Sequence, residues 1–258
     1  MPPIHPRDHS NIRLADAGRR VDMGPLMRFD YKRAVRNSSP ARLLAIAAVA
    51  AVLVLILLPI EGDISGFVVS MAPGGDFRRE LTVLQQFGSA TTIILVAILI
   101  ALLDRPRLPR MFDYLLAAGA TWLAVFIVKI SAGRVRPLHD EPHRFVGPFR
   151  AVPVGKAQAE TYSWEFWKPG VSELWSMPSS HTALAVTAAV FLSIVYPKLR
   201  PLVIGWAILV ALCRMMFDAH YPSDVVAGAA IAWIISAPIV SCSLGTRLIG
   251  SKAPPAAH

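Results

Sequence analysis

The chain has 258 residues, of which 54% are hydrophobic and only 17% are charged, and its mean hydropathy is +0.50. Average proteins carry about 25% charged residues, so this composition excludes a disordered, fibrous or ordinary soluble protein. Several apolar runs approach or exceed the roughly 18 residues needed to cross a bilayer. The sequence therefore predicts an integral membrane protein.

The formal net charge of +9 is divided among short segments between apolar runs, rather than gathered in one domain. Membrane topology explains this distribution better than a nucleic-acid partner does. Cys213 and Cys242 both lie inside apolar runs, which favours two packed thiols over a disulfide framework.

In chain order, residues 1–42 form a basic tail with nine Lys and Arg and no apolar stretch. The apolar run 43–60 is too long for a signal-peptide core, so we expect an uncleaved first span. Further spans are predicted at 87–103, 112–131, 180–197, 201–217 and 224–245. The predicted fold class is all-α: a polytopic membrane helix bundle with six transmembrane helices over 43–246, followed by a short tail, 247–258.

The loops indicate the orientation of the bundle. Outside the spans, sixteen Lys and Arg lie on the side of the N-terminus and eight on the other side. Both termini are therefore expected in the cytoplasm, with the long loop 132–178 on the outer face. The aromatic residues of this loop favour an interfacial belt, with a substrate-lining role as the alternative; they are Trp164, Phe166, Trp167 and Trp175.

Two further cations, Lys129 and Arg214, lie within or at the ends of predicted spans, toward the outer face. An ionisable group at membrane depth is costly and is by default a functional hypothesis. Taken alone, such a residue is more often an interfacial anchor.

Three short segments at the outer helix ends carry the polar residues suited to chemistry. They are Lys129 to Arg136-Pro137, Pro178-Ser179-Ser180-His181, and Cys213-Arg214 through His220 to Asp224. A phosphoryl group needs fixed cations and amides at a helix N-terminus. Lys129, Arg136 and Arg214 can supply the cations, and a helix starting near Ser179 and Ser180 can supply hydroxyls and amides.

Two histidines complete this set. His220 and Asp224 are four residues apart, so the carboxylate could hold one imidazole nitrogen and leave the other free to attack. His181 could then act as the acid, and two histidines sharing these roles would need no metal.

In this order and spacing, the three segments resemble the signature of the type 2 phosphatidic acid phosphatase (PAP2) superfamily. Ser180 stands where the family pattern has glycine, and Cys213 where it has serine. The resemblance implies a six-helix membrane enzyme in which His220 forms a phosphohistidine, Asp224 orients it and His181 protonates the leaving group. The phosphate would be held by Lys129, Arg136, Ser179, Ser180 and Arg214, without a cofactor or metal.

Other polar residues are expected to be solvated. His139 and His143 have acids nearby but lie in a proline-containing loop, so a metal site there is the weaker alternative. Asp218 should face away from His220. Arg134, Arg144 and Arg150 are extra cations for a multiply charged head group or for anionic membrane.

We therefore expect a metal-independent phosphatase of a membrane lipid, such as phosphatidic acid, phosphatidylglycerol phosphate, undecaprenyl diphosphate or lipid A. Its partners would be this lipid and the bilayer, without nucleic acid. It would lie in a bacterial inner membrane with a periplasmic active site. The alternatives are a phosphotransferase with the same chemistry and an anion transporter or channel. A soluble vanadate-dependent haloperoxidase resembles the same motifs, but the hydropathy argues against it.

Overall fold

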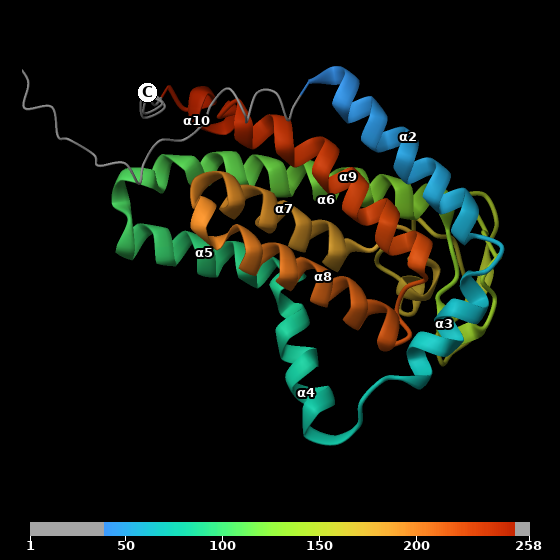
Figure 1. Ribbon diagram of the computed structural model, residues 1–258. Helices are drawn as coiled ribbons and strands as arrows, with labels where there is room; N and C mark the ends of the chain where they lie inside the picture. Colours follow the sequence, from blue (N-terminus) through green and yellow to red (C-terminus); the bar gives the residue numbers. More distant parts are fainter. Residues whose placement is uncertain (1–38, 251–258) are drawn as a thin grey trace, which may run out of the picture.

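The computed structural model describes residues 39–250, so most of the predicted tail 1–42 and residues 251–258 lie outside it. Nine α-helices are described (Figure 1): α2 (Pro40–Leu57), α3 (Glu61–Ser70), α4 (Gly75–Leu84), α5 (Ala90–Leu103), α6 (Met111–Ala132), α7 (Ser180–Val195), α8 (Arg200–Met216), α9 (Pro222–Ser241) and α10 (Leu244–Leu248). Short 3-10 helices are η2 (Gln85–Gly88), η3 (Arg105–Arg110), η4 (Pro137–His139), η5 (Val171–Leu174) and η6 (Pro197–Leu199).

Four helical segments in the described part of the chain are long and apolar enough to cross a membrane: Pro40–Leu57, Arg105–Ala132, Pro197–Met216 and Pro222–Ser241. A fifth is formed if Gly75–Gly88 and α5 count as one span bent by 71°. The predicted span 180–197 is the apolar helix α7, but it has only 16 residues. Four or five membrane spans are therefore found by length and composition. The count of six transmembrane helices remains a prediction.

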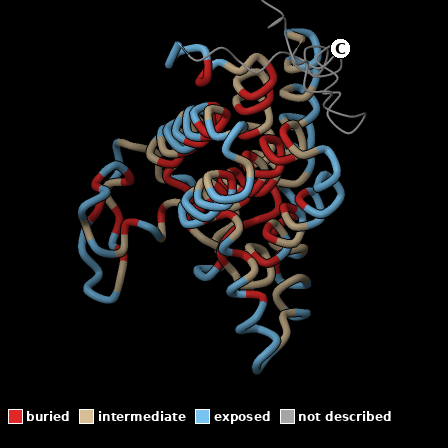
Figure 2. The backbone as a smooth tube through the Cα atoms, turned by 90° about the vertical axis from the view of Figure 1, so that its left-hand side faces the viewer, coloured by how far each residue is buried: buried red, intermediate tan, exposed pale blue. Residues whose placement is uncertain are grey.

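Helix α7 forms the centre of the bundle and packs against α6, α8 and α9. Its alanines allow close approach, and ten of its residues are buried. Phe191 of α7 stacks on Tyr114 of α6 with ring centroids 4.7 Å apart. Figure 2 shows the buried backbone concentrated inside the bundle and exposed backbone around it.

Helix α2 has the opposite character. It has no buried residue although it is strongly apolar, and Leu44 and Leu55 are 70% and 67% exposed. It packs mainly on α9, along the outside of the bundle (Figure 1). An apolar helix with this exposure is stable only where the surrounding solvent is also apolar, as lipid is.

The stretch between the first two predicted spans is helical, which the sequence analysis did not predict. Helix α3 begins at Glu61, whose side chain is fully buried, and α4 projects away from the bundle (Figure 1). The residues of α4 are mixed polar and apolar over only ten positions. Such short segments carry too little periodic pattern to be recognised in advance.

The outer loop is ordered by local turns and a small sheet. Strands β1 (Val152–Val154) and β2 (Ala159–Thr161) pair antiparallel. The protein is mostly helical, as predicted, and this two-stranded sheet is an addition that the sequence analysis did not predict. Gly133 ends α6 in the left-handed conformation, with φ 54°. A Cβ there would lie 2.8 Å from the amide nitrogen of Gly147, so this turn requires glycine.

Gly228 on α9 allows the chain before α7 to approach α9 closely, because a Cβ at this position would lie 2.6 Å from the carbonyl oxygen of Ser179. We expect Gly228→Ala to destabilise the protein by about 1–3 kcal/mol, since a backbone atom cannot move aside easily. The measurement is thermal unfolding in detergent. Gly119→Ala on α6 is the matched control, because nothing lies within 4 Å of its Cβ. Equal stability of the two variants would contradict the prediction.

Candidate active site

One loop segment, residues 175–179, joins the three predicted motifs. The carbonyl oxygen of Trp175 accepts a hydrogen bond from Lys129 Nζ at 2.5 Å, and that of Ser176 accepts one from His220 Nδ1 at 2.6 Å. The amide of Ser179 donates to the carbonyl oxygen of Asp224 at 3.0 Å. Main-chain groups of this segment therefore bring the ends of α6 and α9 together at the start of α7.

His220 lies in the turn before α9 and is 2% exposed. A carbonyl oxygen only accepts hydrogen bonds, so Nδ1 must carry the proton that binds Ser176. Burial lowers the pKa of His220 to about 3, because the charged form loses hydration. The imidazole is therefore neutral at neutral pH, with the lone pair on Nε2.

Asp224 is fully buried at the start of α9 and is held by three donors. One oxygen accepts from Arg134 Nη1 at 2.7 Å, and the other accepts from Ser176 Oγ at 2.5 Å and from the amide of Tyr221 at 2.8 Å. The shortest approach to His220 Nδ1 is 3.7 Å, beyond a direct hydrogen bond. The carbonyl of Ser176 thus holds the nitrogen that we expected Asp224 to hold.

The predicted cations Lys129, Arg136 and Arg214 lie close enough to interact electrostatically. Arg214 donates to Gln85 Oε1 at 3.1 Å, but none of the three forms a salt bridge with a described residue. The buried Nε atoms of Arg136 and Arg214 have no hydrogen-bond partner within residues 39–250, and neither has Nε of Arg134, whose other two nitrogens are paired. Burial lowers the pKa of Arg136, as expected for a desolvated cation whose charge is not fully compensated.

The start of α7 lies beside these cations. Ser179 is the N-cap, and its hydroxyl oxygen accepts from Thr182 Oγ1 at 3.0 Å and more weakly from the Thr182 amide at 3.5 Å. The amides of Ser180 and His181 are in the first turn, where no intrahelical acceptor exists. His181 interacts electrostatically with Arg214, Arg136 and Lys129. The start of α7, the three cations and both predicted histidines thus belong to one site.

Arg134 is the residue whose role the sequence analysis missed. Instead of facing a head group, it is fully buried, where it donates to Glu61, the carbonyl oxygen of Pro142 at 2.6 Å, Ser223 Oγ at 2.7 Å and Asp224. Its guanidinium also lies 4.4 Å from the ring centroid of Tyr221. The only sequence signal was its place two residues before Arg136, and nothing local linked it to Glu61.

The remaining candidates lie apart from this network. His139 Nε2 is 3.2 Å from Glu173 Oε2, and the described residues contain no group of three or more His, Cys, Asp or Glu that could hold a metal. Asp218 is half-buried in a left-handed turn, rather than solvated as expected. Cys213 is buried and both cysteines are free thiols.

We expect Glu61→Ala to destabilise the protein by about 3–5 kcal/mol, because it removes one anion from a buried ion cluster. Asp76→Ala is the matched control, since Asp76 pairs with Arg79 where both side chains are more than 80% exposed, and such a pair contributes about 0–1 kcal/mol. Thermal unfolding in detergent measures both. Similar unfolding temperatures for the two variants would show that the buried cluster does not stabilise the fold.

Comparisons with known proteins agree with this geometry. A family model described as the PAP2 superfamily matches residues 110–247. The lipid A 1-phosphatase of Rhizobium johnstonii is 32% identical over 108 residues, which are 42% of this chain and 37% of that protein. The lipid A 1-phosphatase of Rhizobium etli is 30% identical over 104 residues, 40% of this chain and 38% of that protein. The matches thus span well under half of these relatives.

A solved structure has the same fold. The crystal structure of a transmembrane PAP2 type phosphatidylglycerolphosphate phosphatase from Bacillus subtilis superposes with a TM-score of 0.55 and 17% identity, covering 78% of this chain and 96% of that chain. The family match extends over more than half of the chain and includes every residue of the three motifs. The chain therefore belongs to the PAP2 superfamily.

Proposed function

We propose that this protein is a phosphoric ester hydrolase that removes a phosphate from a membrane lipid, with His220 as the nucleophile. The observation that carries the proposal is a buried histidine with a free Nε2, placed among three cations that form no described salt bridge. Such a set of cations suits a phosphoryl group, whose oxygens need fixed positive charge. Membership of the PAP2 superfamily supports the same activity.

The proposed reaction has two steps. In the first, Nε2 of His220 attacks phosphorus, a P–N bond forms, and the P–O bond to the lipid breaks while His181 protonates the leaving oxygen. In the second, His181 takes a proton from a water molecule whose oxygen attacks phosphorus. A P–O bond forms, the P–N bond to Nε2 breaks, and inorganic phosphate and the neutral His220 are released. Asp224 lies 3.7 Å from Nδ1 and stabilises the charge that His220 gains while it carries the phosphoryl group.

Electrostatic stabilisation would come from Lys129, Arg136 and Arg214, together with the first-turn amides of Ser180 and His181. The hydroxyl group of Ser179 accepts from Thr182, yet it keeps its own hydrogen to donate to a phosphate oxygen. Ser180, where the family pattern has glycine, contributes its amide, which does not depend on the side chain.

The substrate class we propose is a lipid phosphate with its head group at the outer interface. The names of the two curated relatives favour a lipid A phosphate, and that of the solved structure makes phosphatidylglycerol phosphate the next candidate. The distribution of Lys and Arg supports a site on the periplasmic face of a bacterial inner membrane, with both termini in the cytoplasm.

The first test is phosphate release from a panel of lipid phosphates by the purified protein in detergent, with EDTA present. We expect metal-independent release that falls at least about a thousand-fold in His220→Ala. His139→Ala, a loop histidine paired with Glu173, should remain active. Release unchanged by His220→Ala would refute the nucleophile, and phosphate retained on an organic acceptor would indicate phosphotransfer instead.

A second prediction concerns the acid. His181→Gln should slow turnover of a lipid phosphate by about 10²–10⁴-fold, because the leaving alkoxide needs a proton. An aryl phosphate with a good leaving group should still phosphorylate His220 in this variant, and the phosphoenzyme should accumulate because water is no longer activated. Radiolabelled phosphate retained on protein denatured at alkaline pH, where a phosphohistidine is stable, would be measured. Equal losses in both steps for both substrates would contradict the assignment.

A further inference from the structure

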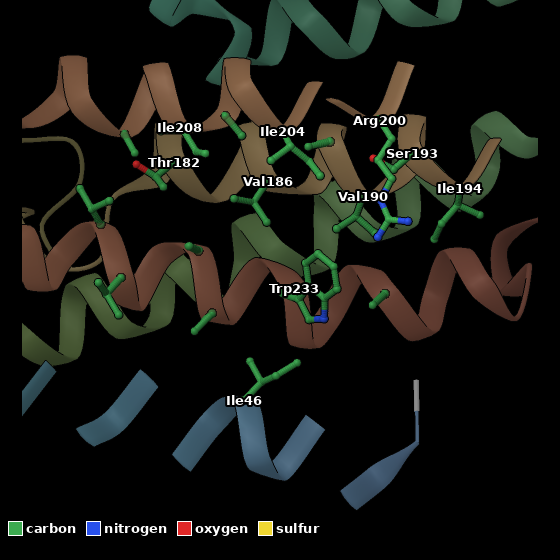
Figure 3. A pocket seen from close by; sticks show the side chains of 18 of the residues that line it. Ile46, Thr182, Val186, Val190, Ser193, Ile194, Arg200, Ile204, Ile208 and Trp233 are labelled. Atoms are coloured by element: carbon green, nitrogen blue, oxygen red, sulfur yellow. The ribbon is translucent and has the colours of Figure 1, made fainter. Parts of the chain in front are cut away.

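An apolar cavity of about 750 Å³ runs between α7, α8 and α9, with α2 on its outer side (Figure 3). Its walls include Val186 of α7, Ile204 of α8 and Trp233 of α9, and Ile46 is its one lining residue from α2. The volume falls within the range of about 300–1,000 Å³ that is usual for ligand sites. We call this cavity the chain groove.

One end of the chain groove adjoins the candidate active site on three helices. Thr182 follows His181 on α7, Val225 follows Asp224 on α9, and Ala211 is about one helical turn before Arg214 on α8; all three line the groove. The opposite end is lined by Ile194 and Arg200 (Figure 3). The groove therefore runs from the end of the bundle that carries the candidate site toward the other end, and none of the predicted site residues lines it.

The length of the groove matches a lipid chain. From Thr182 to Ile194, twelve steps along α7 correspond to about 18 Å. Half of the hydrocarbon core of a bilayer is about 15 Å thick. A chain attached to a head group at the active site could thus lie in the groove over the full depth of one leaflet.

The groove is also accessible from the side. Ile204 and Ile208 line it and are 42% and 56% exposed, so one wall reaches the surface that faces lipid. Helix α2 packs on α9 and has no buried residue, so it borders the groove without closing it against α8. A hydrocarbon chain could enter laterally, without passing through water.

We propose that the chain groove binds one hydrocarbon chain of the lipid whose phosphate is hydrolysed. This inference rests on the proposed function and adds the part of the substrate that the motifs do not address. The phosphate selects the site by its charge, while the groove selects a long apolar chain because each buried methylene adds to the binding free energy. Binding energy from the chain positions phosphorus against Nε2 of His220.

The test fills the groove with a larger side chain. Ala230→Trp on α9 places an indole in it, because Ala230 is a lining residue. Ala48→Trp is the matched control, on an exposed position of α2 that does not line the groove. Each variant is assayed with a long-chain phosphatidic acid and with its short-chain, water-soluble counterpart.

We expect Ala230→Trp to lower kcat/KM at least about tenfold for the long-chain lipid, equivalent to 1.4 kcal/mol, and to leave the short-chain value within about twofold. The control, Ala48→Trp, should change kcat/KM for neither lipid. Equal losses for both lipids, or no loss for either, would overturn the groove as a chain site.

A binding measurement separates failure of the groove from failure of the enzyme. Trp233 lines the groove, so phosphatidic acid with brominated chains should quench its fluorescence in inactive His220→Ala protein. The quenching should saturate and should be smaller in protein that also carries Trp233→Phe. If the lipid quenches Trp233 but the wild type releases phosphate from no lipid of the panel, the hydrolase is rejected and the groove is kept. If phosphate is released from phosphatidic acid but no quenching depends on Trp233, the groove is rejected.

Discussion

The buried guanidinium of Arg134 is the interaction on which the site depends. It bridges Glu61 of α3, the carbonyl of Pro142 in the outer loop, and Ser223 and Asp224 at the start of α9. These groups come from distant parts of the chain, and a charge so far from water is tolerated only when each partner is in place. Assembly of the outer loop, the α3 segment and α9 is therefore coupled to the position of Asp224.

The neighbouring cations show the opposite arrangement. Arg134 has its anions supplied by the fold, whereas Lys129, Arg136 and Arg214 interact electrostatically with one another and form no salt bridge among residues 39–250. Like charges held this close repel one another, which disfavours the charged form of each. The site thus contains two kinds of cation: Arg134, which is fully buried and ion-paired, and the other three, which form no salt bridge with a described residue.

Site residues could be predicted from the sequence where they form short motifs, but not where their partners lie far away along the chain. The motifs identified Lys129, Arg136, His181, Arg214, His220 and Asp224 from short spacings, and the structure brings all of them together. The partners that position them could not be predicted, because Gln85, Ser176 and Glu61 act across long separations in sequence or through main-chain atoms. The span count was limited in the same way, since a bend of 71° and a 16-residue helix are features of packing that hydropathy does not encode.

The hydrogen bond from His220 to the carbonyl of Ser176 also bears on how the site can vary during evolution. Every residue type presents the same carbonyl oxygen, so substitution at position 176 changes the hydroxyl that contacts Asp224 but keeps the acceptor for Nδ1. The imidazole tautomer is thus a property of the backbone path and not of a particular side chain. Sequence drift at this position can change the environment of the Asp224 carboxylate while leaving the hydrogen bond of His220 Nδ1 unchanged.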